Sequence, residues 1–138
     1  MWLDAVSHKY IEEVGQMNQF FVIDDIIYTS PLTGTILKGV TRDSVITLAK
    51  DKGYKLKEEL ITIDKILKTI KSGNLTEAFG AGTAATIASV GELIFKGKNY
   101  VINNNEIGPI TQELYNQLTG IQYGKIQDPY GWNVKIRL

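Results

Sequence analysis

Residues 20–29 read FFVIDDIIYT, and this stretch decides the fold. It contains two β-prone apolar runs, Phe20 to Ile23 and Ile26 to Thr29, which are separated by Asp24 and Asp25. Short acidic residues between two such runs are typical of a tight turn, so the stretch predicts a β-hairpin. A pair of carboxylates in a loop can also bind a metal ion, but a solvated hairpin turn explains Asp24 and Asp25 more simply.

Three helices are predicted on the C-terminal side of this hairpin. Thr41 is expected to cap the first helix, which ends before Gly53. Thr62 is expected to cap a second, shorter helix. The third has Pro109 at its first position and is expected to stop at Gly120.

Strands are predicted over residues 9–32, which include the hairpin, and over residues 54–62 and 76–102. The resulting order is β-β-α-β-α-β-β-α, which does not alternate strictly. We therefore expect an α/β to α+β fold with a mixed sheet. A length of 138 residues suits a single domain over residues 1–138.

Composition excludes several classes of protein. The chain has 15 basic and 15 acidic residues, without the excess of positive charge that nucleic-acid binders show. It has no cysteine and one histidine, His8, so neither a disulfide framework nor a structural zinc site is expected. No apolar run is long enough to span a membrane, and the first residues do not resemble a signal peptide. We expect a soluble, cytoplasmic chain with no membrane, nucleic-acid or metal partner.

The loop-to-helix junction LKGVTRDS, residues 37–44, is a candidate anion site. Gly39 permits a tight turn, and the first amide groups of the following helix are free to bind an anion. The hydroxyl of Thr41 could add a further donor. An ordinary capped helix is the alternative.

A second candidate is AFGAGTAATIAS, residues 78–89. Gly80 and Gly82 would permit positive φ angles and a close approach of ligand to backbone, beside the hydroxyl of Thr83. The segment matches neither a P-loop nor GxGxxG. The alternative is a tight glycine bulge in a sheet.

A third candidate is EEVGQMN, residues 12–18. In a strand, Glu12 and Glu13 point to opposite faces, so one of them is directed inward. A buried carboxylate needs a partner, and a protonated ring nitrogen would be one. An exposed bulge is the alternative.

Four segments together resemble the branched-chain amino acid aminotransferases, fold-type IV enzymes that use pyridoxal 5'-phosphate. They are YIEEVGQMNQFFV (10–22), SPLTGTILKGVTRDSVITLAK (30–50), EAFGAGTAATIASVGEL (77–93) and EIGPITQELYNQLTGIQYGKIQDPYGW (106–132). The resemblance runs in order over about residues 2 to 132. It implies the mixed-sheet, large C-terminal domain of the D-amino acid aminotransferase-like fold.

The resemblance also implies cofactor-binding residues. Glu13 matches the glutamate that binds the pyridine nitrogen and keeps it protonated, which makes the ring a better electron sink. Leu37 matches the residue that packs on the ring face. Val40 and Thr41 match the phosphate binders at a helix N-terminus, and Thr83 matches a further phosphate ligand.

Substrate-binding residues are implied in the same way. Ala84 matches the backbone donor that receives the substrate carboxylate, and Met17 lies where the family lines its side-chain pocket. Gln16 replaces a smaller residue near the substrate, often threonine. The substrates implied are leucine, isoleucine or valine together with 2-oxoglutarate, and the full-length enzyme is expected to be a homodimer.

Other departures concern the loop, a redox motif and the catalytic lysine. Lys38 stands where the family commonly has proline, and Ala85 and Ala88 stand where mammalian members carry a CxxC pair. The family's Schiff-base lysine lies in a segment that would precede Met1, and no lysine of this chain matches it. The expectation is therefore a C-terminal fragment with no catalytic residue of its own, inactive when alone.

Two other functions remain open at this point. A D-amino acid aminotransferase or an aminodeoxychorismate lyase would have the same fold with different chemistry. A stand-alone, non-catalytic ligand-binding domain belongs to another class and predicts a well-behaved monomer without exposed apolar faces.

Overall fold

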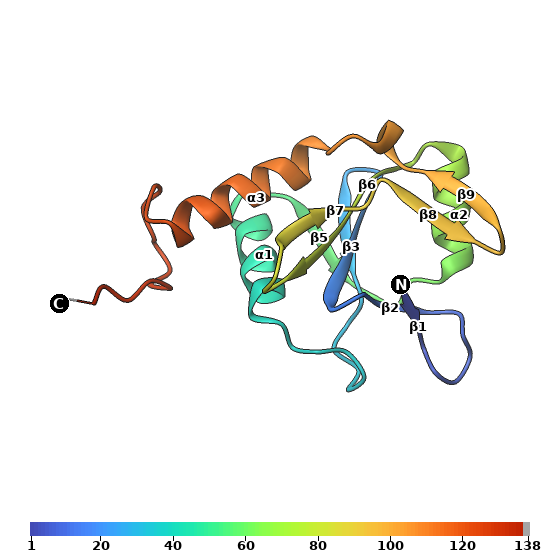
Figure 1. The fold of residues 1–138 in the computed structure, drawn as a ribbon, viewed down its shortest axis with the longest axis horizontal. Helices are drawn as coiled ribbons and strands as arrows, with labels where there is room; N and C mark the ends of the chain where they lie inside the picture. Colours follow the sequence, from blue (N-terminus) through green and yellow to red (C-terminus); the bar gives the residue numbers. More distant parts are fainter. Residues whose placement is uncertain (137–138) are drawn as a thin grey trace.

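The predicted hairpin lies at the centre of a seven-stranded sheet (Figure 1). The computed structural model describes residues 1–136. The strands of this sheet are β1 (Trp2–Leu3), β2 (Ile11–Val14), β3 (Met17–Ile23), β4 (Ile26–Thr29), β5 (Lys55–Glu58), β6 (Leu75–Gly82) and β7 (Thr86–Ser89). A separate two-stranded sheet is formed by β8 (Glu92–Phe95) and β9 (Lys98–Val101).

Strand β3 organises the sheet because it pairs with three other strands. Along one edge it pairs antiparallel first with β2 and then with β4, and along the other edge with β6. Strands β4 and β5 pair in parallel, so the sheet is mixed, as the order of elements predicted. The turn between β3 and β4 is Asp24–Asp25, and both residues have positive φ angles, 49° and 60°. Such angles are typical of tight hairpin turns.

The helices are α1 (Val40–Asp51), α2 (Ile63–Ser72) and α3 (Pro109–Gln122), with a short 3₁₀ turn, η1, at Asn103–Asn105. The prediction for α2 is confirmed, because Thr62 Oγ1 accepts a hydrogen bond from the Lys65 amide at 3.1 Å. Pro109 is the first residue of α3, also as predicted. No helix within residues 1–136 has the length and apolar character that crossing a membrane requires.

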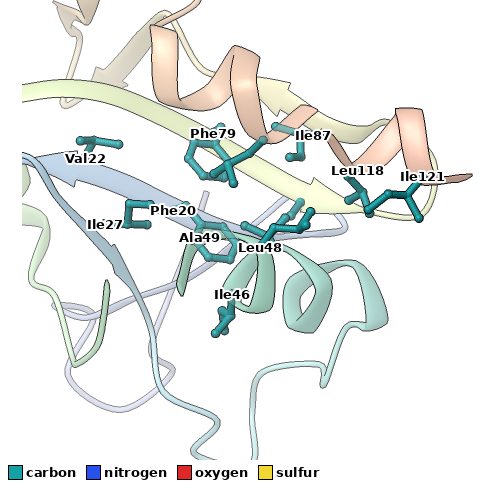
Figure 2. Packing of buried hydrophobic residues seen from close by; sticks show 13 residues of the cluster. Phe20, Val22, Ile27, Ile46, Leu48, Ala49, Phe79, Ile87, Leu118 and Ile121 are labelled. Atoms are coloured by element: carbon teal, nitrogen blue, oxygen red, sulfur yellow. The ribbon is translucent and has the colours of Figure 1, made fainter. Parts of the chain in front are cut away.

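Alternate residues of β3 face two separate cores. Phe20 and Val22 pack with the side chains of α1 and α3, and Figure 2 shows this cluster. Phe21 and Ile23 pack with α2 and the β8–β9 sheet on the opposite face. The continuous apolar run in β3 follows from this arrangement, since a strand covered on both faces buries every side chain.

Helix α3 begins on a buried carboxylate that comes from β6. Glu77 is only 4% exposed, and its two oxygens accept hydrogen bonds from the amides of Ile110 (3.0 Å) and Thr111 (2.7 Å). It also accepts the hydroxyl of Thr111 at 2.6 Å. The N-cap residue of α3, Gly108, has no side chain to cap the helix, so Glu77 performs this role from 33 residues away.

Two helix-end predictions were wrong. Helix α1 is preceded by Gly39 as its N-cap, and Thr41 is the second helical residue and not the cap. Helix α3 continues through Gly120 to Gln122. A Cβ on Gly120 would lie 2.4 Å from Ile126 Cδ1, so this glycine makes room for the chain that returns after the helix.

Residues 123–136, the described part of the segment after α3, have no regular structure, as predicted, but they are attached to the first core. The hydroxyl of Tyr130 donates to Asp51 at the end of α1 at 2.6 Å, and this bond raises the pKa of Tyr130 to about 12. The Tyr130 ring stacks on Trp132, with ring centroids 4.3 Å apart. Asn133 Nδ2 donates to the Ile121 carbonyl at 2.6 Å.

Candidate functional site

Three segments that are far apart in sequence surround one cavity of about 730 Å³. They are the turn between β2 and β3, the loop that leads into α1, and the turn between β6 and β7. The residues lining the cavity are Glu13, Gly15, Gln16, Met17, Asn18, Leu37, Thr83, Ala84 and Ala85. This volume lies within the usual range for small-molecule sites, roughly 300–1,000 Å³.

Glu13 supplies the carboxylate of the cavity. The two glutamates of β2 diverge, as the strand pattern predicted: Glu12 Oε1 accepts from the exposed Thr35 hydroxyl at 2.6 Å, whereas Glu13 lines the cavity. Glu13 Oε1 accepts the backbone amide of Leu37 at 2.8 Å. Within the described chain, no hydrogen bond engages Glu13 Oε2, so this oxygen is available to a ligand.

Leu37 belongs to the loop that crosses beside Glu13. Its side chain is 72% exposed although it is large and apolar, and it lines the cavity. The Gly39 amide donates to the Leu37 carbonyl at 2.8 Å, which turns the chain directly into α1. An exposed leucine next to a carboxylate suits a flat ligand that has both an apolar face and a basic edge.

The N-terminus of α1 lacks a side-chain cap. Its N-cap, Gly39, has no side chain to accept a hydrogen bond, and no other side chain within residues 1–136 accepts one from the amides of Val40 or Thr41. By contrast, α2 is capped by Thr62 and α3 by Glu77. The free amides and the helix dipole of α1 therefore favour an anion.

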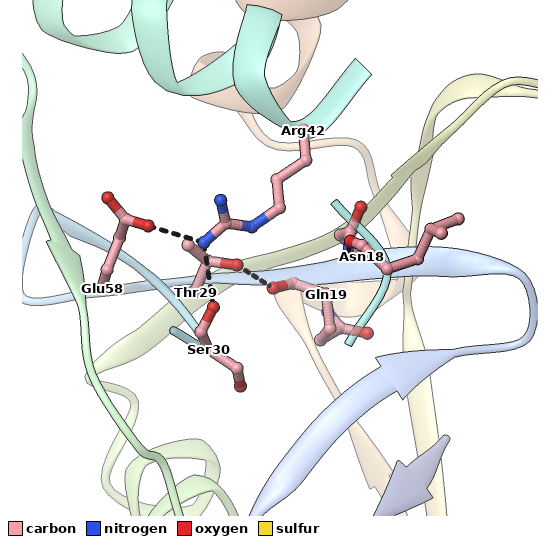
Figure 3. A network of polar contacts seen from close by, with 7 residues as sticks. Asn18, Gln19, Thr29, Ser30, Arg42 and Glu58 are labelled. Atoms are coloured by element: carbon pink, nitrogen blue, oxygen red, sulfur yellow. Dashed lines mark hydrogen bonds and ion pairs between the residues drawn. The ribbon is translucent and has the colours of Figure 1, made fainter. Parts of the chain in front are cut away.

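Arg42 fixes this helix end to the sheet (Figure 3). Its buried guanidinium Nη2 donates to the carbonyl of Ser30 at 3.0 Å and to Glu58 Oε2 on β5 at 2.7 Å. Because Nη2 is bonded to both partners, the Arg42 side chain anchors the first turn of α1.

The β6–β7 turn, Thr83 to Ala85, forms the third wall of the cavity. These residues are exposed and small, so backbone groups and the Thr83 hydroxyl are accessible. The prediction of positive φ angles at Gly80 and Gly82 was wrong, since neither residue has one. A Cβ on Gly80 would lie 2.9 Å from Met17 Cε, and one on Gly82 2.8 Å from Met17 Cγ. The two glycines of β6 therefore make room for the side chain of Met17 on β3, and not for a ligand.

The structure brings most of the predicted site residues together, but two of them lie differently. Glu13, Gln16, Met17, Leu37, Thr83 and Ala84 all line the cavity. The Val40 side chain is 83% exposed and lines a separate hollow with Trp132, and Thr41 is half-buried. Neither residue lines the cavity, so the backbone amides of both residues and the Thr41 hydroxyl are candidate phosphate donors beside the cavity, at the start of α1.

Asn18 was missed by the sequence analysis. It is 4% exposed, lines the cavity and donates from Nδ2 to the Leu37 carbonyl at 3.0 Å. The signal that could have found it is an amide side chain next to the apolar run of β3, where a polar group needs a partner. Residues 1–136 contain no cluster of side chains suited to a metal ion.

The model of the family described as amino-transferase class IV matches residues 5–93, which include every residue that lines the cavity. This chain belongs to the class IV aminotransferase family. Members of the family depend on pyridoxal phosphate.

Curated relatives point to one group within the class IV aminotransferases. The chain is 51% identical over 136 residues to a probable branched-chain-amino-acid aminotransferase of Staphylococcus epidermidis, and 49% identical to branched-chain-amino-acid aminotransferase 2 of Bacillus subtilis. Each match covers 99% of this chain and 38% of the relative. The chain is therefore a homologue of branched-chain aminotransferases and spans about two fifths of their length.

Solved structures agree with this family. The branched-chain amino acid aminotransferase of Escherichia coli matches 94% of this chain and 40% of its own, with a TM-score of 0.78 and 31% identity. The T.th. branched-chain amino acid aminotransferase, solved in complex with N-(5'-phosphopyridoxyl)-L-glutamate, matches 96% of this chain and 40% of its own, with a TM-score of 0.78 and 30% identity. The mixed α/β fold is thus that of the fold-type IV aminotransferases.

Proposed function

We propose that this chain is the C-terminal, cofactor- and substrate-binding part of a branched-chain amino acid aminotransferase. The full-length enzyme, a homodimer, would transfer the amino group of leucine, isoleucine or valine to 2-oxoglutarate. The observation that carries this proposal is the cavity, where the Glu13 carboxylate, the Leu37 side chain and the Thr83–Ala84 turn meet beside the uncapped start of α1.

The residues of the cavity fit pyridoxal 5'-phosphate. Glu13 Oε2 would hold the protonated ring nitrogen, and the exposed Leu37 side chain would cover the ring face. The amides of Val40 and Thr41, with the hydroxyls of Thr41 and Thr83, would bind the phosphate. When bound, the cofactor supplies an electron sink for the carbanion of the substrate.

Substrate recognition is assigned to two turns. The backbone of Ala84 would donate to the substrate carboxylate, because small residues leave the turn open to a ligand. Gln16, on the β2–β3 turn, and Met17, the first residue of β3, would contact the substrate side chain. Gln16 is exposed and longer than the threonine common in the family, so it would reduce the room for a branched side chain.

We place the catalytic lysine outside these 138 residues. No lysine lines the cavity within the described part of the chain, although such a residue is needed to bind the cofactor covalently and to move the substrate proton. The large apolar side chains of Trp2, Leu37 and Val40 are exposed. Their exposure supports the proposal that another part of the protein covers them in the full-length enzyme. The chain alone would therefore bind the cofactor without catalysing transfer.

A chimera tests this function. The present chain replaces, within branched-chain-amino-acid aminotransferase 2 of B. subtilis, the segment that it matches over 136 residues. We expect the chimera to transfer amino groups from leucine, isoleucine and valine to 2-oxoglutarate, and the 138-residue chain alone to show no transfer. A coupled assay for glutamate measures both.

The same assay separates the alternatives. A folded chimera that used D-alanine in place of the branched-chain substrates would indicate a D-amino acid aminotransferase, and one that acted on aminodeoxychorismate would indicate a lyase. A folded chimera without any of these activities would favour the non-catalytic binding domain.

A further inference from the structure

Glu13 and Asn18 hold the same residue from two sides. They are direct partners in the antiparallel β2–β3 ladder, so their side chains project from the same face of the sheet. Glu13 Oε1 accepts the amide of Leu37 at 2.8 Å, and Asn18 Nδ2 donates to the carbonyl of Leu37 at 3.0 Å. Both backbone polar groups of Leu37 are therefore fixed by one pair of strand residues.

The burial of Asn18 makes this contact specific. Asn18 is 4% exposed, and its backbone is paired on both sides, with Glu13 on β2 and Ala81 on β6. A Cβ on Gly39 would lie only 2.4 Å from Asn18 Oδ1, so the amide fills the space under the turn into α1. The position of Asn18 thus defines where Leu37 and the start of α1 lie relative to β2.

This arrangement connects the Glu13 carboxylate in the cavity with the start of α1. Leu37 is three residues before the first residue of α1, whose uncapped amides are the candidate phosphate donors. Its amide also occupies one oxygen of Glu13, which lines the cavity, and so leaves the other oxygen for a ligand. Releasing the Leu37 carbonyl from Asn18 would disturb both the carboxylate and the start of the helix.

We infer that Asn18 is a positioning residue, which fixes the Leu37 backbone so that the Glu13 carboxylate and the N-terminus of α1 bind the ring and the phosphate of one ligand together. This inference rests on the proposed function, because the ligand is the cofactor. Asn18 acts through Leu37 and Glu13.

The test uses the 138-residue chain with Asn18→Leu, which keeps the size of the side chain and removes its donor. The Leu37 carbonyl retains the Gly39 amide, so the loss is limited to one hydrogen bond. The matched control is Thr35→Val, which removes a bond from the same loop to the same strand at Glu12, on an exposed site outside the cavity. Asn18→Ser, which is too short to reach Leu37, replaces the leucine variant if that variant does not fold.

Two readouts are measured. The first is hydrogen exchange of the Leu37 amide in the free chain. The second is binding of 4'-deoxypyridoxine 5'-phosphate, a cofactor analogue that needs no lysine, with its ring-nitrogen titration followed by absorbance at saturation. In the Asn18 variant we expect the Leu37 amide to exchange about five- to tenfold faster, and the analogue to bind about five- to tenfold more weakly, because one hydrogen bond is lost. We also expect the ring nitrogen of the bound analogue to deprotonate at lower pH. Thr35→Val should match the unmodified chain.

Every other outcome contradicts either the inference or the proposed function. Unchanged exchange at Leu37 overturns the inference, and so does faster exchange with unchanged binding and ring titration. Weaker binding with an unchanged ring titration also overturns it, because it shows that Asn18 does not act through Glu13. If the unmodified chain does not bind the analogue, the proposed function fails, and the role of Asn18 toward the cofactor fails with it.

Discussion

Replacing Glu13 with glutamine is expected to lower kcat/KM of the active chimera by about 100- to 1,000-fold, the usual cost of losing one preorganised electrostatic group. Glutamine keeps the size of the side chain and an oxygen that can accept the Leu37 amide. It removes the negative charge that would keep the ring nitrogen protonated. The loss should therefore fall on the chemical step, with kcat lowered more than the affinity for substrate.

The neighbouring glutamate provides the control for this substitution. Glu12→Gln makes the same chemical change one residue away, but Glu12 points to Thr35 at the surface and not into the cavity. We expect its kcat/KM to stay within about twofold of the unmodified chimera, because exposed polar contacts contribute little. Equal losses at Glu12 and Glu13, or no loss at either, would contradict the role given to Glu13.

Replacing Glu77 with alanine is expected to lower the free energy of unfolding by about 3 kcal/mol, because it leaves two buried donors and one half-buried donor without an acceptor. The amides of Ile110 and Thr111 and the Thr111 hydroxyl all lose their partner at the start of α3. Urea unfolding of the 138-residue chain, followed by circular dichroism, measures the change. The control Glu92→Ala removes an exposed glutamate at the start of β8 and should change stability by less than about 0.5 kcal/mol.

Gly108 gives a second test of the same helix start. A Cβ on Gly108 would lie 2.1 Å from Cδ of Glu77, so Gly108→Ala displaces the capping carboxylate. The double variant Glu77→Ala, Gly108→Ala should therefore lose less stability than the sum of the two single variants. Additive losses would show that Glu77 and Gly108 do not interact in this way.

The local patterns predicted the elements of the fold well. The run around Asp24–Asp25, the Thr62 cap and Pro109 each depend on neighbours in sequence, and all three predictions are confirmed. The errors arose where packing against another part of the folded chain determines the role of a glycine. Gly120 continues α3 because Ile126 packs against it, and Gly80 and Gly82 accommodate Met17 from the neighbouring strand.

The residues of the candidate site were predicted from the family resemblance, whereas the helices and strands were predicted from local patterns. The resemblance to a family selected Glu13, Leu37, Thr83 and Ala84, which the structure brings to one cavity. Residue patterns alone left each segment with an ordinary alternative, since nothing local shows that three turns meet. The contact of Asn18 with Leu37 spans 19 residues and depends on strand register, so it could be found only in the folded chain.

The presence of an aminotransferase cofactor site in this chain is tested most directly by a titration with 4'-deoxypyridoxine 5'-phosphate. The isotope-labelled 138-residue chain is titrated, and its backbone amides are followed by two-dimensional NMR. We predict saturable shifts that are largest at Glu13, Leu37, Val40, Thr41 and Thr83, the residues at the cavity and at the start of α1. No saturable binding, or shifts confined to other parts of the chain, would contradict the presence of this site.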